Sequence, residues 1–343
     1  MNLHLEQPGA GTGGNCAMHS VGHAPSRSAG PASSKMGIVA LVVAIVIWGA
    51  NWPVMKAGLD HVTPLWFSSL RFASGALCLL LWQAMRGELR LPRRGDGPFI
   101  ASVGMLQMLA FTALGAVAMT HLPAGRSAML SYVTPLWVVP ASALCFGERV
   151  SRQTVAGVAI CAAGVAILVN PASIDWADAS VVGANAMLLI ASLCWAVCIL
   201  HLRYFRSASS AFELAPWQML SAAGLLAIGA DYNEGPLTLH GSMSFWAILL
   251  FVGPLATAFC FCAVNAASTW MPAGTMSTAM LGVPVTGVAL SVVFFGEPLT
   301  IGLASGSLAI LAGIGVTTLT GSSSPAPEDA STAVPSIRDE RLR

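Results

Sequence analysis

The chain has 343 residues, of which 55% are hydrophobic and only 9% are charged, and its formal net charge is +1. Soluble domains carry about 25% charged residues, so this composition excludes a soluble enzyme. The mean hydropathy of +0.73 excludes an intrinsically disordered chain. The near-neutral charge, without a basic block, excludes a nucleic-acid-binding protein. A lipid bilayer is the environment that suits this composition.

Apolar runs of about 20 residues, the length at which a helix crosses a bilayer, recur along the chain. Charged or turn-forming residues separate them. We expect ten membrane-spanning helices, at residues 37–58, 64–85, 98–120, 124–146, 152–170, 180–201, 211–230, 244–267, 273–295 and 299–320. These helices use most of the chain, so the predicted fold class is an all-α integral membrane protein without a separate soluble domain.

Two polar segments flank the predicted spans. Residues 1–35 are rich in Gly, Ser, Pro and His, and residues 321–343 are also polar. Such compositions predict disorder. A secretory signal needs an apolar core of about 7–15 residues, and residues 1–35 contain none. Met36, which directly precedes the first span, is an alternative start of the protein.

Positive residues gather on one side of the predicted spans. If the N-terminus is cytoplasmic, 13 of the 16 Lys and Arg residues fall in cytoplasmic segments. The other three, Lys56, Arg71 and Arg126, lie within spans or at their edges. By the positive-inside rule, we expect both termini in the cytoplasm. The expected location of such a multi-pass protein is the plasma membrane, which in bacteria is the inner membrane.

An internal repeat relates the two halves of the chain. Residues 121–164 align without gaps on residues 270–313, which lie 149 positions later. Both blocks contain Pro-Ala-Gly, then a proline (Pro135 and Pro284), then Phe-Gly-Glu. Chance similarity between apolar helices gives Ala and Val matches, but not this series of prolines and Gly-Glu pairs. The sequence therefore indicates two copies of one unit.

Each half holds five predicted spans, in residues 36–170 and residues 180–320. Because five is odd, the second half enters the membrane from the opposite side, and the repeat is inverted. This is the architecture of many secondary transporters, in which two halves exchange conformations around a central site. The alternative is a duplication that is retained only for packing.

Several glycines predict helix ends and helix contacts. Gly147-Glu148 and Gly296-Glu297 end the fourth and ninth spans. Glycine suits a helix C-terminus, and we expect the following glutamate to lie at the water interface as part of a structural turn. Small residues allow close contact between membrane helices, which we expect at Gly157, Gly164, Gly302, Gly306 and Gly313.

These patterns resemble the EamA family of the drug/metabolite transporter superfamily. The resemblance is carried by the segment Ile47–Val54 (IWGANWPV), by Leu70-Arg71-Phe72, and by the two Pro-Ala-Gly … Pro … Gly-Glu blocks. It covers residues 36–320. It implies ten helices in two inverted five-helix repeats, with both termini cytoplasmic. It also implies export or exchange of small metabolites, often amino acids and their derivatives, without identifying the substrate.

Arg71 is the most informative residue, because it lies about seven residues into the second span. A charged residue at depth costs at least about 2.5–3.5 kcal/mol, so it should face the interior and have a partner. No carboxylate lies at a comparable depth, which leaves backbone carbonyls, Asp60 or an anionic group of the substrate. A guanidinium binds a carboxylate through two parallel hydrogen bonds. Two interpretations stay open: Arg71 binds a substrate carboxylate or phosphate, or it ties helix ends together.

The first span is interrupted at Trp48-Gly49-Ala50-Asn51-Trp52-Pro53. Pro53 removes an N–H donor and frees the carbonyl of Gly49, and Asn51 is a polar group at depth. Freed backbone groups beside a cavity are typical of transporter sites. Trp48 and Trp52 lie one turn apart and form a candidate apolar wall. A simple kink with packing is the alternative.

Other candidates come from later spans. Trp195 and Gln218 stand 147 positions after Trp48 and Arg71, and Tyr132 lies in the fourth span. The predicted substrate-binding residues are therefore Trp48, Asn51, Trp52, Arg71, Tyr132, Trp195 and Gln218. We predict hinges or kinks at Pro53, Pro135 and Pro284. Lys56 and Arg126 are the candidate outer vestibule, with interfacial snorkelling as the alternative.

No catalytic, metal-binding or cofactor-binding pattern is found. The spans lack a deep Asp or Glu, which argues against efflux of lipophilic cations and against a carboxylate proton relay. No GxxxxGK[ST] loop is present, and seven of the eight cysteines lie in spans, where Cys behaves as a small apolar residue. The expected partners are a small-molecule substrate, the lipid bilayer and, without a visible carrier, a coupling proton.

The sequence favours a secondary transporter that exports or exchanges small metabolites by alternating access. Amino acids or related zwitterions and anions are the leading substrates. The alternatives are a sugar or nucleotide-sugar exchanger and a drug efflux protein. An intramembrane enzyme is a remote alternative, because it needs a buried nucleophile beside a base. A structural or signalling scaffold is another.

Overall fold

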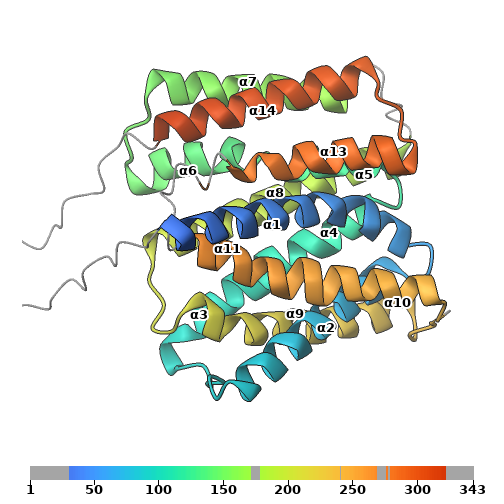
Figure 1. The fold of residues 1–343 in the computed structure, drawn as a ribbon. Coiled ribbons are helices and arrows are strands. Elements are labelled where there is room, and N and C mark those ends of the chain that lie inside the picture. The colour runs from blue at the N-terminus through green and yellow to red at the C-terminus, as the bar shows by residue number, and fades with distance from the viewer. Residues whose placement is uncertain (1–30, 171–177, 240, 269–275, 277–278, 322–343) are drawn as a thin grey trace, which may run out of the picture.

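The computed structural model describes residues 31–170, 178–239, 241–268, 276 and 279–321 (Figure 1). All the regular secondary structure in these ranges is helical. Nine helical segments in them are apolar and at least 18 residues long, and a tenth apolar helix, Gly282–Phe295, has 14 residues. Every predicted span coincides with one of these helices, the ninth over its described part. The prediction of an all-α, multi-spanning membrane protein is confirmed.

The helices form two groups that follow each other along the chain. The first repeat comprises α1 (Pro31–Gly58), α2 (Pro64–Met85), η1 (Arg94–Asp96), α3 (Gly97–Ala101), η2 (Ser102–Ala110), α4 (Phe111–Ala118), α5 (Ala124–Ser131), α6 (Pro135–Phe146) and α7 (Arg152–Val169). The second repeat comprises α8 (Ala179–Tyr204), α9 (Ala211–Glu234), α10 (Met243–Leu250), η3 (Phe251–Phe259), α11 (Cys260–Ser268), α13 (Gly282–Phe295) and α14 (Ile301–Gly321).

Local irregularities of the helices recur at the repeat distance. The segments η2 and η3 are both π-helical, and they lie 149 positions apart at both their first and last residues. The helix of the fourth span breaks at Tyr132–Thr134, between α5 and α6, and a turn at Leu281 precedes α13, again 149 positions after Tyr132. The two halves therefore share their fold in detail, as the alignment of prolines predicts.

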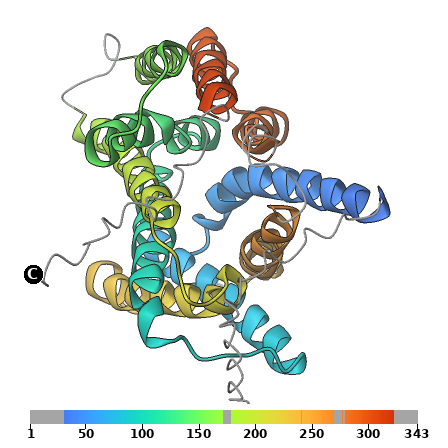
Figure 2. The ribbon, with the colours of Figure 1, turned by 90° about the vertical axis from the view of Figure 1, so that its left-hand side faces the viewer.

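The two repeats run in opposite directions through the molecule. The helix α1 begins at the end of the bundle where its counterpart α8 finishes (Figure 1). Each repeat packs on the other: α2 on α9, α7 on α14, α1 on η3 and α11, and α8 on η2 and α4. Viewed along the bundle, α7 and α14 lie side by side at one edge of the molecule (Figure 2).

Glycines explain why α7 and α14 approach so closely. A Cβ atom added to Gly157, Gly164, Gly306 or Gly313 would lie 2.5–3.0 Å from a backbone atom of the opposite helix. Only glycine permits that spacing, so the predicted close contact is confirmed at these four positions. It is wrong at Gly302, because a Cβ added there would meet no atom of another helix and only the Thr300 hydroxyl, at 4.0 Å.

The two ends of the bundle differ in charge. Both ends of the described chain, Pro31 and Gly321, lie at the same end (Figure 1). We name it the basic end, because it carries Arg86, Arg90, Arg93, Arg94, Arg149, Arg152, Arg203 and Arg206. We name the opposite end the acidic end, because it carries Asp60, Asp178, Asp231, Glu234 and Glu297.

Candidate functional site

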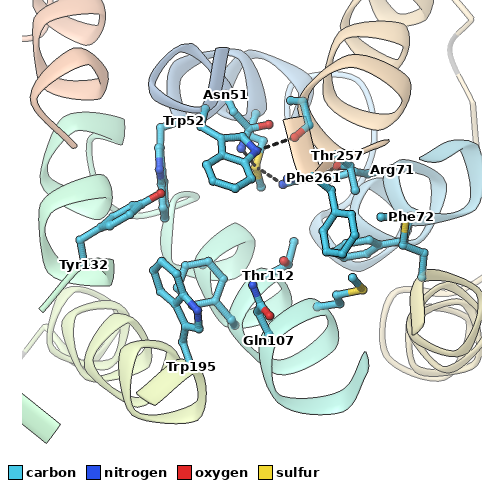
Figure 3. A pocket seen from close by; sticks show the side chains of 17 residues that line it. Asn51, Trp52, Arg71, Phe72, Gln107, Thr112, Tyr132, Trp195, Thr257 and Phe261 are labelled. Atoms are coloured by element: carbon cyan, nitrogen blue, oxygen red, sulfur yellow. Dashed lines mark hydrogen bonds between the residues drawn. The ribbon is translucent and has the colours of Figure 1, made fainter. Parts of the chain in front are cut away.

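A cavity of about 130 Å³ lies between the two repeats (Figure 3). The first repeat lines it from α1, α2, η2, α4 and the end of α5, and the second repeat from α8, α9, η3 and α11. Two of these elements are π-helical, a geometry that is frequent at functional sites. We name it the central cavity.

Six of the seven residues that the sequence nominates for substrate binding line the central cavity: Trp48, Asn51, Trp52, Arg71, Tyr132 and Trp195. Gln218 does not line it. Its amide lies 3.5 Å from the carbonyl of Phe99, and the side chain is buried between α9 and α3. Position in the repeat does not decide this, because Trp48 and its counterpart Trp195 both line the cavity. An amide of the other repeat, Gln107 of η2, lines the cavity.

Arg71 donates hydrogen bonds to two uncharged side chains. Its Nε donates to the hydroxyl of Thr257 at 2.8 Å, and its Nη1 donates to the sulfur of Met55 at 2.9 Å. The Thr257 hydroxyl in turn donates to the carbonyl of Val252, five residues earlier in η3, at 2.6 Å. The π-helical geometry therefore helps to orient the acceptor of Arg71.

The charge of Arg71 is not neutralised by any described residue. Three ion pairs occur in the described ranges, and neither Arg71 nor its proposed partner Asp60 takes part in them. A guanidinium has five N–H donors, and three of those of Arg71 bind no described residue. The central cavity thus presents a positive charge with free donors.

Asn51 lies beside Arg71 and is also incompletely paired. The residue is 7% exposed, and its Nδ2 donates to the sulfur of Met55 at 3.2 Å. Its Oδ1 is buried and accepts no hydrogen bond from the described residues. Since Met55 accepts a hydrogen bond from both side chains, Arg71 and Asn51 are close neighbours (Figure 3).

Aromatic rings form another wall of the central cavity. The ring centroids of Trp52 and Phe111 are 6.3 Å apart, those of Phe111 and Trp195 are 5.2 Å apart, and those of Tyr132 and Trp195 are 5.2 Å apart. All three pairs meet edge to face, an arrangement that aromatic side chains prefer. We name Trp52, Phe111, Trp195 and Tyr132 the aromatic row. The predicted partner of Trp52, Trp48, instead fixes its indole N–H on the carbonyl of Ala256 at 2.6 Å.

The segment that is predicted to interrupt the first span lies where α1 packs against α13. Pro53 is buried within α1, and α1 continues through it. A Cβ on Gly49 would lie 2.5 Å from the side chain of Thr286, and the Gly49 carbonyl faces Gly287 of α13. The structure therefore places this carbonyl at the α1–α13 contact and not in the central cavity.

The other two predicted hinge prolines lie near helix starts. Pro135 is the first residue of α6, directly after the break at residues 132–134. Pro284 is buried at the third position of α13. Proline is tolerated in the first turn of a helix, where the missing N–H has no intrahelical partner. The two residues thus mark related places in the two repeats.

Of the two residues predicted to form an outer vestibule, Arg126 borders a second cavity and Lys56 borders neither that cavity nor the central one. Lys56 donates to the carbonyls of Met119 and Leu122, after the last turn of α4, and so stabilises a helix C-terminus. Arg126 donates to Asn185 at 2.9 Å and to the carbonyl of Val169 at 3.1 Å, and it borders a second cavity at the acidic end. Neither residue lines the central cavity.

The two Gly-Glu motifs end their helices as predicted, but their carboxylates bind different partners. Gly147 and Gly296 have φ values of 67° and 63° and end α6 and α13. Glu297 accepts hydrogen bonds from the backbone N–H groups of Ala124 at 2.6 Å and Gly125 at 2.9 Å, at the start of α5. Glu148 forms an ion pair at 2.8 Å with an arginine of α8 and accepts from a neighbouring tyrosine.

A membrane bundle built from two inverted repeats, with a cavity lined by both, defines a transporter. A family model confirms the class: the chain belongs to the EamA-like transporter family, whose model matches residues 35–170 and again residues 183–319. The resemblance found in the sequence motifs is therefore correct.

Two named relatives cover most of the chain, and a third covers a part of it. It is 25% identical over 275 residues to "Uncharacterized transporter YvbV" of Bacillus subtilis, covering 80% of this chain and 88% of that protein. It is 28% identical over 296 residues to a "Probable amino-acid metabolite efflux pump" of Salmonella typhimurium, covering 82% and 94%. It is 34% identical over 131 residues to a "Probable terminal-alkyne amino-acid exporter" of Streptantibioticus cattleyicolor, covering 38% and 43%.

A solved structure, titled "Crystal structure of protein", has the same fold. It superposes with a TM-score of 0.58 at 22% sequence identity and covers 84% of this chain and 97% of its own.

Proposed function

We propose that this protein is a secondary transporter that exports or exchanges small carboxylate-bearing metabolites, with amino acids and related zwitterions or anions as substrates. The observation that carries the proposal is the uncompensated guanidinium of Arg71 in a cavity that both repeats line. Alternating access moves the substrate across the bacterial inner membrane. The basic end lies in the cytoplasm, with both termini, because positive loops stay on that side.

The energetics of Arg71 favour an anionic substrate. A charged residue within the membrane costs at least about 2.5–3.5 kcal/mol unless it finds a partner, and a substrate carboxylate supplies one through two parallel hydrogen bonds. The names of two relatives, an amino-acid metabolite efflux pump and an amino-acid exporter, point to the same class of compound.

The size of the central cavity favours a compact substrate. Its volume is about 130 Å³. An apolar cavity of about 150 Å³ accommodates benzene, so this space is on the scale of a small metabolite. A nucleotide sugar is several times larger, and amino acids are therefore the better fit of the two.

Counterflow in proteoliposomes tests the proposal. Vesicles are loaded with a mixture of unlabelled amino acids, and uptake of each labelled amino acid is measured for the wild type, Arg71→Gln and Arg126→Gln. Arg126 is the matched control, because it is a half-buried arginine that binds protein groups outside the central cavity. We expect saturable exchange that Arg71→Gln lowers at least about tenfold, the loss typical of charge-assisted hydrogen bonds, while folded Arg126→Gln keeps it.

Two results would contradict the proposal. Full exchange by Arg71→Gln would assign Arg71 a structural role. Failure of the folded wild-type protein to exchange any amino acid would remove this substrate class. Efflux of aromatic drugs is the second candidate, since the aromatic row offers them a binding wall. In that case, uncharged aromatic compounds would exchange at equal rates in the wild type and in Arg71→Gln.

A further inference from the structure

One buried acceptor without a partner belongs to a residue that lines the central cavity. The described residues contain six buried side-chain N or O atoms without a hydrogen bond. Of these six, Asn51 Oδ1 alone belongs to a residue that lines the central cavity. Buried polar atoms are nearly always paired, so such an exception needs an explanation. A donor supplied by the substrate would provide one.

The position of this acceptor specifies the kind of donor. Asn51 and Arg71 each donate to the thioether of Met55, at 3.2 Å and 2.9 Å, and a thioether is a weak acceptor. Both polar groups are thus turned toward one sulfur and remain under-satisfied, one as an acceptor and one as a cation. An α-amino acid carries the complementary pair, an ammonium and a carboxylate, on one carbon atom.

The remaining walls specify the side chain of the substrate. Arg71 is the one Asp, Glu, Lys or Arg side chain among the described residues that line the central cavity. A charged substrate side chain would therefore find no opposite charge beyond the group already used. The aromatic row lies across the cavity from Arg71 (Figure 3) and offers apolar ring surface.

We propose that Asn51 binds the substrate ammonium through Oδ1, and that the substrates are neutral α-amino acids with apolar side chains. Arg71 holds the carboxylate, and the aromatic row contacts the side chain. This inference rests on the proposed transport of carboxylate-bearing metabolites, and it adds a second polar contact and a selectivity to it.

The test compares two compounds that differ only in the ammonium group. Phenylalanine and 3-phenylpropanoate compete for exchange of labelled leucine in the counterflow assay. In the wild type we expect 3-phenylpropanoate to compete at least about tenfold more weakly, because it lacks a hydrogen bond to a charged group. In Asn51→Leu we expect the two compounds to compete within about threefold of each other, because the acceptor that favours phenylalanine in the wild type is absent.

A neighbouring polar residue provides the control. Thr112 is 6% exposed and lines the same cavity, and Thr112→Val removes its hydroxyl at nearly constant shape. We expect Thr112→Val to keep the preference for phenylalanine. If Thr112→Val loses it while Asn51→Leu keeps it, the ammonium binds elsewhere and the proposal is overturned. The wild-type comparison needs no variant, and equal competition by the two compounds would overturn the proposal by itself.

Charged amino acids test the proposed selectivity. We expect glutamate and lysine to compete at least about tenfold more weakly than phenylalanine, because their side-chain charges would be buried without a partner. Equal competition by either would overturn the apolar selectivity. Absence of exchange with every carboxylate would instead refute the proposed function itself, so the two failures can be told apart.

Discussion

Glu297 connects the two repeats at the acidic end of the bundle. It follows α13 in the second repeat, and it binds the first two backbone N–H groups of α5 in the first repeat, at 2.6 Å and 2.9 Å. A helix N-terminus carries free N–H groups and a partial positive charge, so a carboxylate is the best partner for it. Glu297→Gln removes the charge and replaces one acceptor oxygen with an NH2 group that faces an N–H donor.

The size of the effect follows from this geometry. Hydrogen bonds to charged groups contribute about 1.5–3 kcal/mol, and the favourable field of a helix N-terminus adds about 0.3–1 kcal/mol. Glu297 is half-buried, and glutamine keeps one of the two acceptors. We therefore expect the contact to weaken by about 1–2 kcal/mol, which corresponds to roughly a 5- to 30-fold change in an equilibrium constant.

The consequence depends on alternating access. In the proposed alternating access, opening the acidic end would separate the two repeats there and would break the contact between Glu297 and α5. Weakening the contact between Glu297 and α5 should raise the population of the state that is open at the acidic end. Ala128 of α5 is 0% exposed and packs against Gly287 of α13, so an Ala128→Cys variant reports this opening through its rate of labelling by a membrane-impermeant maleimide. We expect Glu297→Gln to accelerate the labelling by roughly 5- to 30-fold.

The repeat supplies a matched control. Glu148 is the counterpart of Glu297, lies at the basic end and binds α8 instead of α5. In the same Ala128→Cys background, Glu148→Gln should not accelerate labelling from the acidic end. Unchanged labelling in folded Glu297→Gln, or an equal acceleration in Glu148→Gln, would refute the reasoning.

Three further variants test separate parts of the structure. Gly313→Ala places a Cβ 2.5 Å from a backbone nitrogen of α7 and should lower the free energy of unfolding in detergent by about 1–3 kcal/mol. Gly302→Ala on the same helix should leave it unchanged. Equal free energies of unfolding for the two variants would refute the close packing. Thr257→Val removes the acceptor of Arg71 Nε and should raise KM for a carboxylate substrate several-fold at unchanged expression; an unchanged KM would contradict this role. Lys56→Met removes the donor to the carbonyl of Leu122 after α4 and should lower the free energy of unfolding by about 0.3–1 kcal/mol without changing KM. A raised KM would place Lys56 on the substrate path.

The sequence predicts the fold well because one physical property dominates it. A membrane helix must be apolar for about 20 residues, and the loops between helices carry the charges, so the spans stand out directly. The exception in length is the ninth span, which is predicted at residues 273–295 and contains the 14-residue helix Gly282–Phe295. Residues 273–275 and 277–278 of the prediction lie outside the described residues.

The central cavity is predictable only where polarity is unusual. Arg71 and Asn51 stand out because polar groups at depth are costly and therefore mark an interior face. Gln107 and Thr257 escape notice because they lie in η2 and η3, where the helix is π-helical. A π-helix shifts the angular position of each following residue, so a 3.6-residue period misplaces the faces of these two spans.

Equivalent residues of the two repeats make different contacts, and this asymmetry fits the proposed alternating access. Arg203 stands 147 positions after Lys56, and Glu297 stands 149 positions after Glu148. At the basic end, Glu148 and Arg203 form an ion pair at 2.8 Å. At the acidic end, their counterparts stay apart: Glu297 binds the start of α5, and Lys56 binds carbonyls after α4. Two copies of one unit thus adopt two arrangements within one molecule. Exchanging the arrangements between the repeats would turn each end into the image of the other, so a cavity between them would face the opposite side of the membrane.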